Sequence, residues 1–253
     1  MRLDHFLRKA SHNYAKKVYI FKGDIQGYFM SLPREELFQR AIWGLDQQFK
    51  GHKNTPEYRL IKYLWHQIIF DNPIDGVKRK GKLDLWEKLP KSKSLFCQKP
   101  GRGIVIGNLT SQLLSNIYLD QLDQYVTKNL GYKYYGRYVD DFYIVVTEEQ
   151  LPQLKKDIHA IEVFLMTKKL TLHPQKRYLQ ESSKGVAFLG AVIYPNRIVA
   201  GKRLVKNIRK AFAEISRGEK DTSTAVSYLG HVKHFNSYKM MKREFEAVGW
   251  VFQ

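Results

Sequence analysis

Cysteine is nearly absent from this sequence, and so are long apolar runs. Cys97 is the one cysteine among 253 residues, so no disulfide can form within the chain and a reducing compartment is expected. Free cysteines are usually buried, which predicts a packing role for this thiol. No apolar run reaches the roughly 20 residues of a membrane span, and the opening MRLDHFLRKASHNY lacks the apolar core of a signal peptide. We therefore expect a cytoplasmic protein.

Acidic residues are also scarce. There are 24 Asp and Glu against 43 Lys and Arg, which gives a formal net charge of +19. A surplus of that size repels itself in the compact state, so a polyanionic partner is expected. Nucleic acid is the first candidate and an anionic membrane surface the second.

Several catalytic patterns are missing as well. The eight histidines show no HExxH or paired ligand spacing, so no zinc site is expected. No phosphate-binding glycine loop and no Ser-His-Asp arrangement stands out. By contrast, 43% of the residues are hydrophobic and 13% are aromatic, which excludes general disorder and predicts a sizeable core in one large or two small domains.

Two stretches predict β structure. KKVYIFKGDIQGYF, residues 16–29, is rich in β-branched and aromatic residues and predicts a strand that ends in a turn at Gly27. KGVAFLGAVIYPNRIVAG, residues 184–201, predicts a hairpin that turns at Pro195 and Asn196.

Apolar residues at helical spacing predict the helices. One begins near SLPREELF, with Ser31 as a candidate cap and Pro33 in the first turn. A second closes at Gly131, where a glycine suits the C-terminal cap. Others are expected over 57–70, 150–170 and 202–215.

Two adjacent aspartates, Asp140 and Asp141, lie between strand-like runs in YGRYVDDFYIVV. One interpretation is turn chemistry, since Asp is common in hairpin turns. The other is a metal site, because crowded carboxylates need a cation and hard oxygen ligands suit Mg²⁺. Asp24, which ends the first strand, is the candidate third carboxylate, and Ile25 could offer its backbone carbonyl. Such a set predicts two ions about 4 Å apart, as in nucleotidyl transfer.

Five motifs together resemble the catalytic palm of reverse transcriptases. They are KGDIQGYF, YVDD, TLHPQKRYL, FLG at 188–190, and VSYLGHVKHFNSYKMMKR, in this order along the chain. The resemblance implies an α+β fold, a right-hand polymerase palm of antiparallel sheet and packed helices with a helical thumb. It places a fingers remnant at 1–17, the palm at 18–183 with a basic insertion at about 51–103, a primer-grip hairpin at 184–200 and the thumb at 201–253. The fingers are expected to be truncated.

The resemblance also assigns roles to residues. The catalytic set is Asp24, Asp140, Asp141 and Lys176, with Asp24, Ile25, Asp140 and Asp141 as metal ligands. The nucleotide-binding set is Ile25, Phe29, Ile106, Gly107, Ser111, Gln112 and Asn116, with Phe29 as a steric gate against ribonucleotides. The primer and template set is Phe188, Leu189, Gly190, Lys202, Arg203 and Lys206. For several of these residues a plainer role stays open, such as a helix cap for Ser111, a packed amide for Asn116 or a surface position for Lys176.

The implied function is RNA-directed DNA polymerisation with two Mg²⁺ ions, for which Mn²⁺ can substitute. The implied partners are an RNA template, a DNA or RNA primer and dNTPs, without a membrane. The stretch IGNLTSQLLSN, with Ile106 where most bacterial members have Gln, is similar to the error-prone enzymes of diversity-generating retroelements. That subgroup implies a bacterial or phage-encoded protein with a small accessory protein. A non-catalytic nucleic-acid-binding remnant and a group II intron or retron-type enzyme remain the alternatives.

Overall fold

The computed structural model describes residues 2–72, 74–221 and 223–246. The chain divides into two compact units, Phe21–Leu179 and a second unit made of Met1–Ile20 with Gln180–Gln253. Each unit is considered by itself. Among the described residues, we find no helix with the length and apolar character that crossing a bilayer requires.

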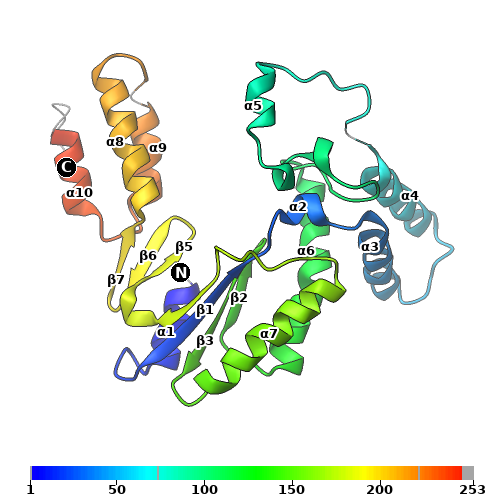
Figure 1. Cartoon of the computed structure of the whole chain (residues 1–253), viewed down its shortest axis with the longest axis horizontal. Helices are drawn as coiled ribbons and strands as arrows, with labels where there is room; N and C mark the ends of the chain where they lie inside the picture. Colours follow the sequence, from blue (N-terminus) through cyan, green and yellow to red (C-terminus); the bar gives the residue numbers. More distant parts are fainter. Residues whose placement is uncertain (1, 73, 222, 247–253) are drawn as a thin grey trace. The chain divides into compact units, whose positions relative to one another are not determined.

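A four-stranded sheet in the order β2-β3-β1-β4 is the centre of the first unit (Figure 1). The strands are β1 (Val18–Asp24), β2 (Tyr135–Tyr138), β3 (Asp141–Thr147) and β4 (Tyr178–Glu181). β2 and β3 form an antiparallel hairpin in which Tyr138 pairs with Asp141. Five consecutive residues of β3, from Phe142 to Val146, are buried, which is the pattern of an interior strand covered on both faces.

Helices complete the first unit. α3 (Arg34–Phe49) packs against both α4 (Pro56–Phe70) and α6 (Leu109–Gln124), and α7 (Leu151–Thr167) packs against β3. A turn of π-helix, Tyr125–Asn129, extends α6. Gly131 then takes a φ of 76°, a left-handed conformation that suits the glycine predicted to close this helix.

Short elements lie between the longer helices and strands of this unit. They are α2 (Tyr28–Ser31), α5 (Leu83–Glu87) and the 3₁₀ turns Lys91–Lys93 and Leu95–Cys97. Gly27 precedes α2 with a φ of 56°, and a Cβ there would lie 2.6 Å from the carbonyl oxygen of Ser92. Both the conformation and the close approach therefore require glycine at the predicted turn.

The second unit contains a small sheet and a group of helices. β5 (Val186–Phe188), β6 (Ala191–Tyr194) and β7 (Arg197–Ala200) form a three-stranded antiparallel sheet. Helices α8 (Lys202–Ser216), α9 (Ser223–Val232) and α10 (Tyr238–Glu246) share a buried apolar cluster centred on Ile208 and Phe212. α1 (Arg2–Ala10) and the 3₁₀ turn Ser182–Lys184 also belong to this unit.

The α+β fold predicted from the sequence is confirmed, and three local predictions are corrected. The stretch 184–201 forms three strands, because Leu189 and Gly190 make a second turn with φ of 49° and 80°. Ser31 does not cap α3; it ends α2, and its hydroxyl donates to the carbonyls of Gln26 and Gly27. Cys97 is exposed and is not a packing residue.

The close contact between β1 and β3 gives a test of the sheet. A Cβ at Gly23 would lie 2.6 Å from Cζ of Phe142, whose side chain is buried. We expect Gly23→Ala to lower the free energy of unfolding by about 1–3 kcal/mol, because the core must shift to accept the methyl group. Urea denaturation measures this value.

The matched control is Gly44→Ala in α3, where nothing lies within 4 Å of the added Cβ. We expect this substitution to stabilise the protein by about 0.5–1 kcal/mol, since alanine favours a helix interior. Equal effects of the two substitutions would contradict the packing of β1 against β3.

Candidate active site

Asp24 stands at the buried end of β1. Its residue surface is only 8% exposed, so its carboxylate is held in place by the surrounding chain. The carbonyl of Asp24 accepts a hydrogen bond of 2.7 Å from the backbone N–H of His173. Its carboxylate accepts from Nζ of Lys176 at 3.1 and 3.2 Å.

The turn between β2 and β3 presents Asp140 and Asp141. Val139 and Asp140 are its two central residues, because Tyr138 pairs with Asp141 across the hairpin. The turn lies beside β1, since the N–H of Ile25 donates to the carbonyl of Asp140 at 3.3 Å. The N–H and C=O of a strand residue face the same neighbour, so the carbonyl of Ile25 faces this turn as well.

Burial and nearby charge both act on Asp140. Burial raises the pKa of its carboxyl group, and the negative charges of Asp24 and Asp141 raise it further, while Lys176 acts in the opposite direction. The predicted carboxylates are therefore close enough to repel one another. A nearby cation would favour the ionised form of these carboxylates.

Lysines supply the cations that the structure contains. Lys176 contacts Asp24, and Nζ of Lys22 lies 3.1 Å from the carboxylate of Asp141. The Lys22 side chain is 15% exposed and that of Lys176 is 56% exposed. Lys22 is thus enclosed next to its partner, whereas Lys176 is free to leave Asp24 for solvent or for another anion.

The donor set has the chemistry of a hard divalent cation site. Carboxylate and carbonyl oxygens are the ligands that Mg²⁺ prefers, and burial together with the negative charges of Asp24 and Asp141 raises the pKa of Asp140. Among the described residues, however, no three Asp, Glu, His or Cys side chains are grouped closely enough to hold a metal ion. In this structure the lysine ammonium groups, not a metal cluster, lie against Asp24 and Asp141.

A backbone contact joins Phe29 to the segment that precedes Ile106. Phe29 is half-buried on α2, and its carbonyl accepts a hydrogen bond of 3.0 Å from the N–H of Ile104. Two residues further on, Ile106 is 62% exposed. Gly107 follows with a φ of 105°, a conformation in which glycine is strongly favoured.

The remaining nucleotide residues lie on the first turns of α6. Gln112 and Asn116 are exposed, whereas Ser111 is buried. Asn108 occupies the N-cap position of α6, so the alternative of Ser111 as the cap is wrong. Asn116 is not a packed amide either, because its exposed side chain accepts a hydrogen bond from Arg137.

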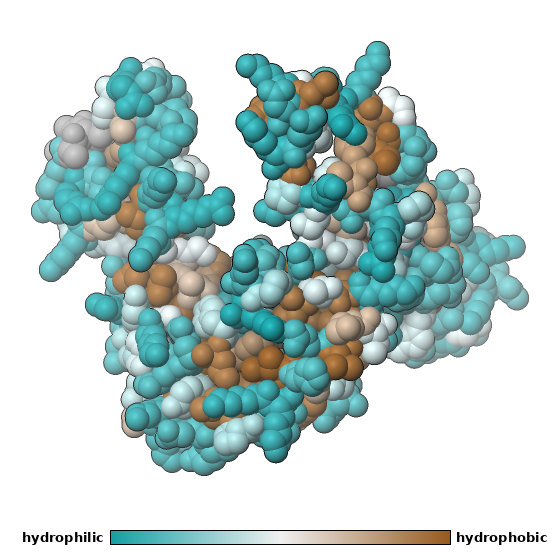
Figure 2. Space-filling model, viewed as in Figure 1, coloured by the Kyte–Doolittle hydropathy of each residue, from teal (hydrophilic) through white to brown (hydrophobic). Residues whose placement is uncertain are grey.

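The predicted primer and template residues belong to the second unit. Phe188 is buried in β5, and Leu189 and Gly190 form the turn that follows. Lys202, Arg203 and Lys206 are exposed on the first two turns of α8. Hydrophilic residues cover most of the visible surface of α8 and α9 (Figure 2).

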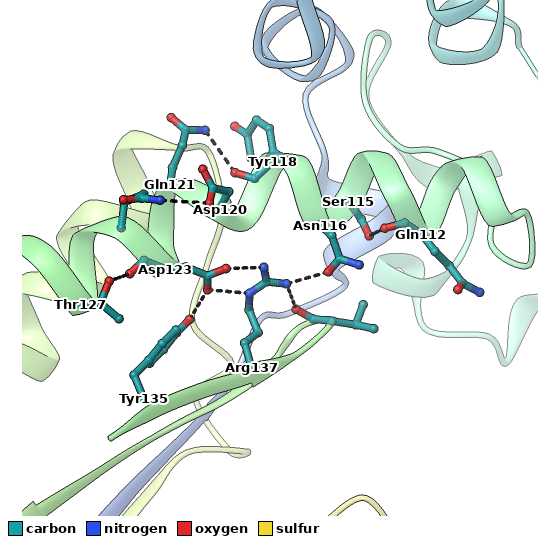
Figure 3. Close-up of polar contacts among 12 residues, drawn as sticks. Gln112, Ser115, Asn116, Tyr118, Asp120, Gln121, Asp123, Thr127, Tyr135 and Arg137 are labelled. Atoms are coloured by element: carbon teal, nitrogen blue, oxygen red, sulfur yellow. Dashed lines mark hydrogen bonds and ion pairs between the residues drawn. The ribbon is translucent and has the colours of Figure 1, made fainter. Parts of the chain in front are cut away.

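Two features of the site were not predicted from the sequence. One is the contact of Lys22 with Asp141. The other is a network around Arg137, a residue of β2 whose side chain contacts Asp123 and Asn116 of α6 (Figure 3). The excess of basic residues hides both, because no local pattern distinguishes Lys22 or Arg137 from the other 41 lysines and arginines among the 43 in the chain.

A family comparison decides what kind of protein this is. The model described as reverse transcriptase (RNA-dependent DNA polymerase) matches residues 2–193. The chain belongs to the reverse transcriptase family. A search of curated proteins found no match.

Solved structures of telomerase share the fold of this reverse transcriptase chain. Apo telomerase from Candida tropicalis aligns with a TM-score of 0.55 and 14% identity, over 96% of this chain and 46% of that chain. The same enzyme in complex with a TWJ fragment of telomeric RNA gives a TM-score of 0.53 and 14% identity, over 98% and 42%. A form truncated from its C-terminal domain gives 0.52 and 16%, over 79% and 39%. The chain spans less than half of each telomerase chain.

The crowding of carboxylates predicts opposite effects of two substitutions on stability. Because burial and neighbouring charges raise the pKa of Asp140, its ionised form destabilises the folded state at neutral pH. We expect Asp140→Asn to raise the urea midpoint in buffer that contains EDTA. Asp141→Asn serves as the control, because it loses the ion pair with Lys22 and should leave stability unchanged or lower it by up to about 1 kcal/mol. A lower midpoint for Asp140→Asn would contradict the charge crowding.

Proposed function

We propose that this chain is an RNA-directed DNA polymerase that extends a primer on an RNA template by two-metal nucleotidyl transfer. The observation that carries the proposal is the convergence of Asp24 with the Asp140–Asp141 turn, in a chain of the reverse transcriptase family. Family membership supports the type of reaction, and the carboxylates at the end of β1 supply a place for it.

Asp24, Asp140, Asp141 and the carbonyl of Ile25 are the residues that would hold Mg²⁺, with Mn²⁺ as a substitute. When bound, the two ions favour ionisation of the primer 3′-hydroxyl and neutralise the triphosphate. Asp24 and Asp140 are the direct ligands in this proposal. Asp141, which Lys22 holds at 3.1 Å, contributes its charge from beside them.

Lys176 serves the leaving group. Its ammonium lies on Asp24 in the absence of substrate, and its exposed side chain can turn to an incoming phosphate once other cations hold that carboxylate. There it offsets the charge of pyrophosphate or donates a proton to it. A contact with Asp24 is what distinguishes Lys176 from a surface lysine.

Phe29 and the start of α6 receive the nucleotide. The half-buried ring of Phe29 is the proposed barrier to a ribose 2′-hydroxyl. The exposed residues Ile106, Gln112 and Asn116 face substrate in this proposal, with Gly107 giving backbone access and Ser111 supporting the helix behind them. Phe188, Leu189, Gly190 and the basic residues of α8 grip primer and template through stacking and phosphate contacts.

The finer assignment is to the error-prone enzymes of diversity-generating retroelements, which work with a small accessory protein. Its support is the IGNLTSQ stretch, in which Ile106 is apolar and 62% exposed. A branched apolar side chain cannot hydrogen-bond a template base or a nucleotide, so discrimination between right and wrong pairs falls. The same stretch disfavours the group II intron and retron alternatives.

Primer extension on an RNA template with Mg²⁺ tests the proposal. We expect the chain to extend a DNA or RNA primer with dNTPs, and an Asp140→Ala/Asp141→Ala variant to lose the activity by more than about 10³-fold, since the metal ligands are gone. Salt-sensitive binding of the template–primer by both proteins is the control for folding. Binding without extension by the unsubstituted chain would contradict the enzyme and support the non-catalytic remnant.

Ile106→Gln tests the basis of low fidelity. The side chain is exposed, so the substitution costs little packing. We expect misincorporation opposite template adenine to fall roughly fivefold, the effect of one hydrogen bond of about 1 kcal/mol. Leu109→Gln is the matched control, because Leu109 is 80% exposed at the start of the same helix. Unchanged misincorporation in Ile106→Gln, or an equal drop in Leu109→Gln, would contradict the role of Ile106.

A further inference from the structure

Arg137 donates four hydrogen bonds, and each of its three guanidinium nitrogens takes part. Nε and Nη2 donate to the two carboxylate oxygens of Asp123 at 2.8 and 2.6 Å. Nη1 donates to Oδ1 of Asn116 and to the carbonyl of Val139, both at 2.9 Å. The contact of Nη2 with Asp123 is also an ion pair. The hydroxyl of Tyr135 donates to Asp123 at 2.6 Å and completes the network (Figure 3).

The network joins the catalytic hairpin to α6. Arg137 and Tyr135 come from β2, whereas Asp123 and Asn116 are two turns apart on α6. The side chain of Arg137 is only 10% exposed, so its charge is directed inward and is not available to the phosphates of a nucleic acid. Burial opposes this charge, and the contacts with Asp123 outweigh burial and keep the pKa of Arg137 above its usual value.

The turn that Arg137 contacts is strained. Val139 has a φ of 56°, in the left-handed region. A positive φ at the first central residue of a two-residue hairpin turn favours glycine, and a β-branched residue there is an outlier. The conformational preferences of Val139 therefore do not stabilise this turn, so a hydrogen bond from another residue has to stabilise it.

Arg137 contacts the peptide group between Val139 and Asp140. The carbonyl of Val139 belongs to the peptide group that leads into Asp140, so fixing it sets the direction in which the Asp140 carboxylate leaves the backbone. The bidentate grip on Asp123 leaves the guanidinium plane little freedom. Arg137 thereby fixes the position of Asp140 relative to α6. The same helix carries the predicted nucleotide residues Gln112 and Asn116.

We propose that Arg137 is a positioning residue that, clamped on Asp123, holds the strained Val139 turn and aligns Asp140 with the nucleotide-binding face of α6. The inference rests on the proposed polymerase function for its catalytic consequence. Its structural content, the control of one turn by one guanidinium, is independent of that function.

The experiment compares Arg137→Ala, Arg137→Lys and Asp123→Asn with the unsubstituted chain. Hydrogen–deuterium exchange of the segment 138–146 reports on the turn, and the segment 151–167 of α7 reports on the rest of the same unit. Primer extension gives kcat, and filter binding gives template–primer affinity. Thermal unfolding measures global stability. Asp123→Asn keeps the size of the side chain and serves if Arg137→Ala does not fold.

We expect faster exchange at 138–146 in all three variants, with little change at 151–167. A misplacement of about 1 Å at a reacting group costs about 10²-fold in rate, so kcat should fall by that order at unchanged template–primer affinity. Arg137→Lys should recover most of the thermal stability lost in Arg137→Ala, because it keeps the charge. It should not recover kcat, because an ammonium cannot hold the carboxylate and the Val139 carbonyl in one plane.

Arg40→Ala is the matched control. Arg40 lies on α3 and contacts Asp120 of α6, the helix that also carries Asp123, at 2.5 Å. Its side chain is similarly enclosed, with 17% exposed, and its partner is not a residue of the hairpin. This variant should leave exchange at 138–146 and kcat unchanged.

Two results would overturn the inference: unchanged exchange at 138–146 when Arg137 is replaced, or full recovery of kcat by Arg137→Lys. If the unsubstituted chain extends no primer, the proposed function fails, while the exchange measurement still decides whether Arg137 controls the turn.

Discussion

Like charges held close together at the end of β1 are the constraint on which the rest of this site depends. Asp24, Asp140 and Asp141 cannot all be ionised and unpaired in a partly buried position without a large electrostatic cost. Lys22 and Lys176 reduce that cost from two sides. The backbone contributes as well, because the bond from Ile25 to Asp140 fixes the turn beside the strand. The pKa of Asp140 is nevertheless raised, first by burial and then by the charges of Asp24 and Asp141, and a divalent cation would favour its ionised form.

The same arrangement combines several features that are locally unfavourable, a combination that proteins retain mainly where function requires it. A left-handed Val139, a buried arginine and a cluster of carboxylates are each unfavourable locally. They persist because α6 and the sheet surround them with contacts that are individually strong, above all the bidentate pair of Arg137 and Asp123. The shared fold with telomerase concerns this framework of sheet and helices, whereas the chemistry depends on the side chains set into it.

Regular elements and the hairpin that carries Asp140 and Asp141 could be predicted from the sequence, because their signals are local. The aromatic and β-branched runs on both sides of YVDD and the apolar spacing of α6 and α7 predict elements that the structure contains. The extra turn at Leu189 and Gly190 was missed, because Pro195-Asn196 gives a stronger turn signal in the same stretch. The prediction that Cys97 is buried was wrong, because its exposure depends on how the short 3₁₀ turns pack. The partners of Lys22 and Arg137 could not be predicted from local sequence, because they depend on which face each strand and helix presents to the other.

The two ion pairs of the site also have a consequence for how the protein is made. Lys22 and Asp141 are 119 positions apart in the chain, and Lys176 and Asp24 are 152 apart. Contacts of such sequence separation form late, because closing a long loop costs entropy before the contact can return it. During synthesis the N-terminal carboxylate of the site emerges early and waits for most of the first unit before its lysine partner follows. A ribosome-bound intermediate that ends before Lys176 therefore has the β1 aspartate without its counter-charge, and the charge balance of the site is complete only when the first unit has been synthesised almost to its end.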